Sequence, residues 1–280
     1  MSGCKMSIFV TDEDQRKAED INGKRFLYSK FQFLGAHAGL RPGELHMLIG
    51  TSGSGKSTLA RSIAIDCARN HRVLFWSSEE SIKSLALSFN KLTRDKDILD
   101  NIFIYPEMTM PDQFRKKDPN LFMEFFREKT MSYFPDVIFI DNITTSHMYS
   151  DAIGWEGQGI VSGALVKYAV KNEIPIFMVA HTKKGIVDNQ NQLINITDIR
   201  GNAVISMNAG YAYVLQSFKV ENRMVAILHI QKHRNHKDIT EKYYHMGYED
   251  GNYVKDRPVP FSFVNEVFQL RNRLKSKFEK

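Results

Sequence analysis

Cysteine is almost missing from this 280-residue sequence, which contains Cys4 and Cys67 but no C-x-x-C pair. Two thiols cannot form a disulfide framework, and the usual structural zinc sites need more cysteines. No apolar run approaches the ~20 residues of a transmembrane helix, and the first residues lack the apolar core of a signal peptide. Internal repeats and low-complexity segments are missing too. We therefore expect a soluble protein of a reducing compartment, without a membrane partner.

No large excess of charge is present either, because 38 Lys and Arg side chains face 32 Asp and Glu. This balance is a mild bias towards polyanionic partners. With 42% hydrophobic residues the chain has an ordinary globular composition and can bury a large core. The basic C-terminal stretch leaves two interpretations open, a solvated helical tail or a nucleic-acid-binding patch. Its cations are Arg271, Arg273, Lys275, Lys277 and Lys280.

Short apolar segments alternate with helical patterns through the middle of the chain. Continuously apolar strands separated by helices predict a mostly parallel sheet flanked by helices, an α/β fold. One expected helix follows Lys56, and the others cover residues 81–92, 120–131 and 160–172. The expected strands are Leu45–Ile49, Val73–Trp76, Val137–Ile140, Ile174–Val179 and Tyr211–Leu215.

The last third of the chain has a different pattern. Residues 224–231 and 241–246 are expected to be strands, and the polar residues 232–238 between them are expected to form a turn. Two strands joined by such a turn predict an antiparallel extension of the sheet.

A complete G-x-x-x-x-G-K-[ST] pattern occupies residues 50–57, between an expected strand and an expected helix. Its glycines let the backbone curl so that N–H groups point at phosphate oxygens, beside the positive end of the helix. Lys56 would reach the β- and γ-phosphates of ATP, and the Ser57 hydroxyl would bind Mg²⁺. The expected nucleotide-binding residues are Gly50, Thr51, Ser52, Gly53, Ser54, Gly55, Lys56, Ser57 and Thr58.

Acidic residues follow two other apolar strands. Asp141 would open onto the crevice at the carboxyl edge of a parallel sheet, where it can hold Mg²⁺ through water; the alternative is a cap of the next turn with Asn142. Glu79 and Glu80 follow the strand that ends at Trp76. A Glu there can orient and deprotonate an attacking water, or it can stabilise the first turn of the next helix. We assign the first role to Glu79 and the second to Glu80.

Several further segments occur in a specific order around the phosphate-binding loop. They are Gly39-Leu-Arg-Pro-Gly-Glu-Leu45, Ser78-Glu-Glu-Ser81, Asp136-Val-Ile-Phe-Ile-Asp141, Val179-Ala-His181, Ile196-Thr-Asp-Ile-Arg-Gly201 and Gln231-Lys-His-Arg234. The ordered set resembles the RecA-like motor domain of DnaB-type replicative helicases, most closely that of the phage primase-helicases. The resemblance covers about residues 33–255 and implies a RecA-like P-loop NTPase.

The resemblance implies roles that spacing alone does not. Glu79 matches the catalytic base, and His181 matches a sensor of the γ-phosphate, although a histidine at a strand end can also be a purely structural residue. Arg234, with Lys232, matches an arginine finger that acts on the nucleotide of a neighbouring subunit; the alternative is a solvated turn in a basic stretch. Tyr248 lies near the position of a tyrosine that stacks on adenine. The cations placed on single-stranded DNA are Lys183, Lys184 and Arg200.

The function that follows is an ATP-dependent DNA helicase motor of DNA replication, with Asp141 and Ser57 on Mg²⁺. It would form a homo-oligomer, which the resemblance implies to be a hexameric ring. We expect it to work beside a primase or other replication proteins in the cytoplasm of a bacterial or phage-infected cell, with the mitochondrial matrix as the second choice. Two alternatives stay open: a recombination or annealing ATPase that binds single strands without unwinding duplex, and a regulatory RecA-like ATPase without DNA.

The expected domain organisation has one motor between two shorter segments. Residues 1–30 would be an N-terminal extension, in which residues 11–21 are a candidate subunit-linking helix. The RecA-like motor would cover residues 31–260, followed by the basic tail 261–280.

Overall fold

A single mixed sheet organises the computed structural model, which describes residues 27, 29–35, 39–115, 118–149, 153–183, 193–201, 203–220, 223–234 and 240–278. Within these residues the sheet has the strand order β3-β2-β4-β5-β1-β6-β7-β8-β9. The strands are β1 Leu45–Gly50, β2 Val73–Ser77, β3 Ile102–Pro106, β4 Val137–Asp141, β5 Ile176–His181, β6 Tyr211–Val220, β7 Arg223–His233, β8 Lys242–Glu249 and β9 Asn252–Val259.

The first half of the sheet, from β3 to β6, is parallel. Strands β1, β2 and β4 are buried along their whole length. Because helices cover both faces of a parallel sheet, these strands consist mostly of apolar residues. The predicted α/β fold with a mostly parallel sheet is confirmed.

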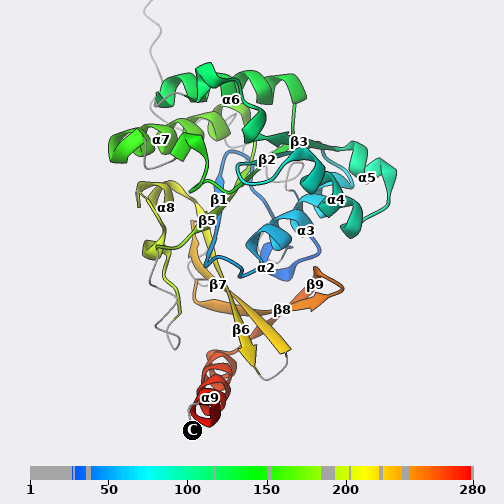
Figure 1. Cartoon of the computed structure of the whole chain (residues 1–280), viewed down its shortest axis with the longest axis vertical. Helices are drawn as coiled ribbons and strands as arrows, with labels where there is room; N and C mark the ends of the chain where they lie inside the picture. The colour runs from blue at the N-terminus through cyan, green and yellow to red at the C-terminus, as the bar shows by residue number, and fades with distance from the viewer. Residues whose placement is uncertain are drawn as a thin grey trace, which may run out of the picture.

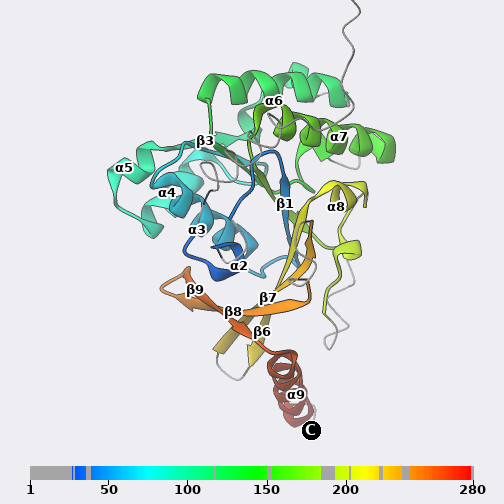
Figure 2. The same ribbon diagram turned by 180° about the vertical axis from the view of Figure 1, so that it is seen from behind.

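Helices cover the two faces of the parallel half separately (Figures 1 and 2). One face packs against α3, α4 and α5 and the segment around α2, and the other packs against α6, α7 and α8. The helices are α2 Gln32–Gly35, α3 Lys56–Ala68, α4 Ile82–Leu92, α5 Lys96–Asp100, α6 Pro119–Tyr133, α7 Gly154–Asn172 and α8 Val204–Asn208, with 3₁₀ turns at Glu107–Thr109, Asp112–Phe114, His147–Tyr149 and Ile196–Asp198.

An aromatic cluster fixes α6 on the sheet. The indole of Trp76, at the end of β2, lies 5.3 to 6.2 Å from the rings of Phe122, Phe125 and Phe126. These phenylalanines are spaced by three and four positions, so they share the buried face of the helix. Burial of each large aromatic side chain contributes on the order of 2 kcal/mol or more to stability.

The second half of the sheet is antiparallel, as predicted, with β6 to β9 in consecutive hairpins. The predicted turn at residues 232–238 begins too early, because β7 continues through His233 and pairs with β6 at Tyr211. Strands β3 and β9 are additional to the sequence-based prediction. Strand β3 is an apolar run, Ile102–Tyr105, that the sequence analysis missed, whereas β9 has no such run.

The C-terminal residues form α9, Phe261–Phe278, which extends from the antiparallel half. Its Val264, Val267 and Phe268 are buried against Phe218 and Ile227 of the sheet. The first half of the expected basic tail is therefore a packed amphipathic helix and not a solvated one.

Two sequence-based predictions fall outside the described residues. They are the candidate linking helix at 11–21 and the placement of Lys184. Among the described helices, none is both long and apolar enough to cross a membrane.

Hairpin β8–β9 returns to the parallel half of the molecule, where it lies beside α2 and α3 (Figures 1 and 2). The buried carboxylate of Asp256 accepts hydrogen bonds from the backbone N–H groups of Gln32 at 2.6 Å and Phe33 at 2.8 Å. The side chain of Asn252 is hydrogen-bonded to Ser62 of α3. The antiparallel extension is thus anchored to α2 and to α3, the helix that follows the loop 51–55.

Candidate nucleotide site

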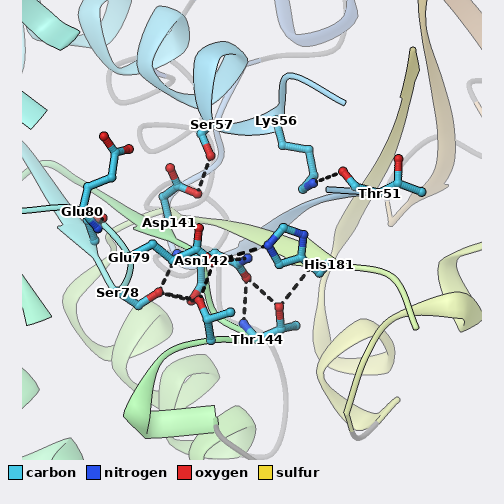
Figure 3. A network of polar contacts seen from close by, with 12 residues as sticks. Thr51, Lys56, Ser57, Ser78, Glu79, Glu80, Asp141, Asn142, Thr144 and His181 are labelled. Carbon is cyan, nitrogen blue, oxygen red and sulfur yellow. Dashed lines mark hydrogen bonds and ion pairs between the residues drawn. The ribbon is translucent and has the colours of Figure 1, made fainter. Parts of the chain in front are cut away.

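The carboxyl ends of four parallel strands meet at one edge of the sheet. Gly50 of β1 pairs with His181 of β5, and Ser77 of β2 pairs with Asp141 of β4. Because ligands of open α/β sheets bind at this edge, the arrangement concentrates the sequence-predicted residues where a ligand site is expected. Figure 3 shows Ser57 and Asp141 pointing towards each other, with Glu79, Asn142 and His181 gathered beside them.

The loop between β1 and α3 has the backbone conformation that its glycines permit. Gly53 and Gly55 have φ angles of 75° and 89°, in the left-handed region that other residues adopt only with strain. A Cβ on Gly50 would collide with the carbonyl oxygen of Leu215. Glycine is therefore required at these positions by the path of the chain, which curls around the start of α3.

Lys56 begins α3 and is buried, with 3% of its surface exposed. Its Nζ donates hydrogen bonds to the carbonyl oxygen of Thr51 at 2.5 Å and to Ser54 Oγ at 3.5 Å. Burial lowers the pKa of Lys56 to about 8, while the carboxylates of Asp141 and Glu79 act in the opposite direction. The Lys56 ammonium is buried beside neutral oxygen acceptors. An anionic ligand bound in the loop would stabilise its charged form.

Ser57 and Asp141 lie together beside the loop, with Ser57 Oγ donating to Asp141 Oδ1 at 3.1 Å (Figure 3). Burial raises the pKa of Asp141 to about 6, against the influence of Arg61 and the Ser57 hydrogen bond. A hydroxyl and a carboxylate are the hard oxygen donors that Mg²⁺ prefers. No group of three His, Cys, Asp or Glu side chains in the described part of the chain could hold a metal ion. Proteins often bind Mg²⁺ through one or two side chains together with substrate phosphates.

Glu79 extends from the turn after β2 towards the end of β5. Its Oε1 accepts hydrogen bonds from Thr145 Oγ1 at 2.9 Å and Asn142 Nδ2 at 3.3 Å, and lies 3.4 Å from His181 Nε2. The contact with His181 is the largest cause that lowers the pKa of Glu79, and the charge of Lys56 adds to it. Glu79 is therefore an ionised carboxylate at neutral pH, half-exposed at the site and oriented by its neighbours.

A hydrogen-bond network behind Glu79 links three strand ends (Figure 3). Asn142 Oδ1 accepts from Thr144 Oγ1 at 2.7 Å, and Thr144 Oγ1 accepts from the backbone N–H of His181 at 3.1 Å. Ser78 Oγ lies 2.7 Å from Thr145 Oγ1. The sequence analysis did not assign a role to these hydroxyls. The available signal was the polar segment 142–146 directly after a buried strand.

The turn after β4 is held by a buried acid that the sequence analysis also missed. Glu107 has 1% of its surface exposed and accepts hydrogen bonds from Trp76 Nε1 at 3.0 Å, Ser146 Oγ at 2.7 Å and the backbone N–H of His147. Burial raises its pKa. Glu107 thereby fixes the segment that carries the threonines around Glu79.

Glu80 points away from Glu79 and pairs with Arg61 of α3 at 2.7 Å. Its other carboxylate oxygen accepts from Ser84 Oγ at 2.8 Å, within the first turn of α4. The helix itself is capped by Ser81, whose side chain accepts from the N–H of Ser84. The two adjacent glutamates thus lie in different environments, one at the site and one joining two helices.

His181 connects the site to the chain that follows β5. Its ring Nδ1 is buried without a hydrogen-bond partner among the described residues. Its carbonyl oxygen accepts from the backbone N–H of Arg200 at 2.9 Å, and Lys183 donates its backbone N–H to Asp198 at 2.8 Å. Two of the three cations predicted to contact DNA, Lys183 and Arg200, are therefore brought next to the end of β5.

Arg234 and Lys232 lie at the opposite edge of the sheet. Arg234 pairs with Glu44 at 3.0 Å, and Lys232 Nζ donates to the carbonyl oxygen of Met207 at 2.7 Å. Glu44 directly precedes β1, and Gly50 ends it. At a rise of roughly 3.3 Å per residue, Glu44 lies about 20 Å from the start of the loop. Arg234 is thus not part of the site of its own chain.

Tyr248 lies on hairpin β8–β9 and has 52% of its surface exposed. Its ring meets that of Tyr253 edge-on at 5.1 Å between centroids. Tyr253 Oη in turn donates to the carbonyl oxygen of Ser54 at 3.3 Å. Tyr253 therefore lies between the exposed ring of Tyr248 and the phosphate-binding loop. The sequence analysis did not single out Tyr253.

Comparison with known families matches residues 36–186 to the family described as AAA domain. This is more than half of the chain and includes the loop, Glu79, Asp141 and His181. The matched region ends before β6 and before the antiparallel extension.

Among individual proteins, the chain is similar to DNA repair proteins RadA. It is 30% identical to that of Streptococcus pyogenes serotype M3 over 165 residues, which are 57% of this chain and 33% of the relative. The corresponding protein of Streptococcus pneumoniae is 29% identical over 165 residues, covering 57% and 35%, and that of Aquifex aeolicus is 25% identical over 166 residues, covering 57% and 33%. The matched region thus spans about a third of the length of these relatives.

Proposed function

This chain belongs to the AAA domain family, and on that basis we propose that it is an ATP hydrolase whose cycle drives movement on single-stranded DNA, as the motor of a helicase. It is a P-loop ATPase domain related to the RadA DNA repair proteins. The observation that carries the finer proposal is the Glu79–His181 contact of 3.4 Å. This contact joins the water-activating carboxylate to the strand end that leads into the cationic segment.

The chemistry proposed for the site uses its own side chains. Glu79 accepts a proton from the attacking water as the water oxygen bonds to the γ-phosphorus and the bond to ADP breaks. Lys56 and the loop N–H groups neutralise the charge that develops on the phosphate oxygens. Ser57 and Asp141 would hold a magnesium ion, which would supply a further positive charge to stabilise the phosphate oxygens.

The coupling to DNA is proposed to run through β5. Loss of the γ-phosphate changes what His181 faces on one side, and its backbone is hydrogen-bonded to Arg200 on the other. Exposed Lys183 lies on the same segment. Cations that contact phosphates give sequence-independent, salt-sensitive binding. The names of the relatives, which are DNA repair proteins, favour a nucleic-acid partner.

The active form is proposed to be an oligomer in which Arg234 reaches the nucleotide of a neighbouring copy, with Lys232 beside it. The distance between Arg234 and the loop of its own chain supports this arrangement. An arginine supplied in trans can accelerate phosphoryl transfer by about three to five orders of magnitude. A hexameric ring is the assembly that the resemblance to DnaB-type helicases implies.

The direct test measures phosphate release with and without single-stranded DNA at low salt, and then unwinding of a forked duplex. We expect hydrolysis that DNA stimulates, and unwinding that requires ATP. Lys56→Ala should abolish both. Lys183→Ala combined with Arg200→Ala should remove the stimulation while leaving the DNA-free rate, and Lys219→Ala, on an exposed strand position far along β6, is the matched control.

A second candidate is a DNA-repair ATPase that binds single strands without unwinding duplex, and it is favoured by the similarity to RadA proteins. DNA-stimulated hydrolysis without unwinding would establish this candidate instead. Hydrolysis that is indifferent to DNA, together with no DNA binding at low salt, would contradict both and favour a regulatory ATPase.

A further inference from the structure

A single backbone carbonyl of the phosphate-binding loop, that of Ser54, is held from outside the loop by two hydroxyl groups. Ser217 Oγ donates to it at 2.8 Å, and Tyr253 Oη donates to it at 3.3 Å. The two donors come from β6 and β9, 163 and 199 positions away along the chain. Both strands lie outside the region matched by the family, so this support is supplied by the antiparallel extension.

The direction of this carbonyl determines the direction of one loop N–H group. The peptide bond between Ser54 and Gly55 is planar, and in a trans peptide the C=O and N–H point to opposite sides. Hydroxyls that hold the Ser54 oxygen towards the outside of the loop therefore aim the Gly55 N–H towards its inside. The inside is where Lys56 is buried and where an anion would be bound.

The space around this peptide is fully used. Tyr253 has 2% of its surface exposed, and its Oη lies 2.5 Å from the position that a Cβ on Gly55 would occupy. Gly55 also has a φ of 89°. Burial raises the pKa of Tyr253 to about 12, so its hydroxyl stays protonated and able to donate at neutral pH. The tyrosine hydroxyl thus closes the outer side of the loop at Gly55, where a side chain would not fit.

We propose that Tyr253 and Ser217 are positioning residues of the nucleotide site, which orient the Ser54–Gly55 peptide so that its N–H binds the diphosphate of the nucleotide. They act through the backbone and do not contact the ligand themselves. The inference rests on the proposed function in that it requires nucleotide binding at the loop. It adds that hairpin β8–β9, and not the P-loop segment alone, sets the affinity for the phosphates.

The test uses Tyr253→Phe, Ser217→Ala and the double variant, with Tyr243→Phe as the control. Tyr243 is in the same hairpin, and its hydroxyl contacts Glu241 away from the loop. Phe at position 253 keeps the ring that supports Tyr248, so only the hydroxyl is lost. The measurements are the Kd of ADP and of dTDP, the KM and kcat for ATP, and the midpoint of urea unfolding.

We expect each single variant to raise the Kd of ADP about threefold to tenfold, the effect of one lost hydrogen bond to a buried carbonyl. The double variant should exceed the product of the two factors, because each single variant retains one hydroxyl on the carbonyl. KM for ATP should rise with the Kd of ADP, while kcat changes by less than about twofold. The same factor should apply to dTDP, since the base is not involved.

Several results would overturn the inference. One is a double variant that binds ADP as tightly as the wild type and Tyr243→Phe; another is a lowered unfolding midpoint with unchanged Kd, which indicates a purely structural role. An effect confined to one base would assign Tyr253 to the support of Tyr248. If Tyr253→Phe does not fold, Ser217→Ala decides the matter from the other strand. A wild-type protein that binds no nucleotide contradicts the proposed function itself, and this outcome is seen before any variant is made.

Discussion

Glu79 and Glu80 are neighbours in the chain, yet their side chains have different partners. Glu79 faces His181 and Asn142 at the strand ends, and Glu80 forms an ion pair with Arg61. The sequence analysis separated their roles on position alone. The structure adds a physical difference between them, because Glu79 contacts residues at the strand ends whereas Glu80 joins α3 to α4.

The two glutamates provide a matched pair of variants. Glu79→Gln removes the proton acceptor while keeping the size and one acceptor oxygen, so we expect kcat for ATP hydrolysis to fall by about two to four orders of magnitude with ATP binding retained. Glu80→Gln keeps an oxygen that can accept the hydrogen bond from Ser84 Oγ, and it should change kcat by less than about threefold, as expected of a partly exposed ion pair. Phosphate release and equilibrium nucleotide binding measure the two effects. Equal losses in both variants would contradict the assignment of Glu79.

At the scale of elements, β1 runs from the amino end to the carboxyl end of the parallel strands. It contains a buried histidine near its start. His46 is fully buried; its Nε2 accepts from the backbone N–H of Arg41 at 3.1 Å, and its Nδ1 lies 3.2 Å from Tyr213 Oη. Its ring stacks on Tyr211 at 4.3 Å. Burial lowers the pKa of His46 to about 3, and the charges of His233 and Arg41 act in the same direction.

This histidine makes the stability depend on pH. Between about pH 3 and 6.5 the unfolded chain binds a proton at His46 that the folded chain does not, so the free energy of unfolding falls as the pH falls through this window. Above pH 6.5 the group contributes no slope. The slope from this group is about 1.4 kcal/mol per pH unit. Urea unfolding at several pH values should show it in the wild type, and His46→Gln should flatten the curve below pH 6.5. A wild-type curve and a variant curve with the same slope would refute the prediction.

Hairpin β8–β9 makes contacts with the loop and with α2 that the sequence analysis did not predict. Strand β9 contains Lys255, Asp256, Arg257 and Pro258 and has no apolar run, because it is an edge strand of the sheet and only its Tyr253 and Asp256 are buried. Its function in the fold is to bring Tyr253 to the loop and Asp256 to α2. Contacts of this kind depend on the pairing register of β8 with β9, which no local pattern specifies.

At the scale of the whole molecule, the two halves of the proposed reaction centre lie on opposite edges of one sheet. The phosphate-binding loop, Glu79 and Asp141 are at the carboxyl edge of the parallel strands, and Arg234 is at the amino edge beside Glu44. Under the proposed function, a chain with this arrangement would complete its site with a second copy. Repetition of the same head-to-tail contact closes into a ring when the rotation between copies allows it.

Mixing two inactive variants tests this arrangement. Arg234→Ala and Glu79→Gln should each hydrolyse ATP poorly alone, and their mixture should recover part of the activity, because some interfaces then combine an intact Glu79 with an intact Arg234. Arg223→Ala, an exposed arginine at the far end of the same strand, is the control and should keep the wild-type rate. Phosphate release as a function of mixing ratio is the measurement. A mixture that stays as inactive as its components argues against a finger supplied in trans.

The sequence by itself determined the phosphate-binding loop and, apart from β3, the strands of the parallel half of the fold. Buried strands are continuous apolar runs, and the loop is a contiguous pattern whose glycines are required by its own backbone path, so both are encoded locally. Ser57 and Asp141 could be assigned to one site because the ends of parallel strands meet at one edge of the sheet. Only the tertiary structure decided which side chains support these residues. Tyr253 under Gly55, Glu107 beneath the turn after β4, and the separation of Arg234 from its own loop depend on packing between distant segments, which a linear pattern does not contain.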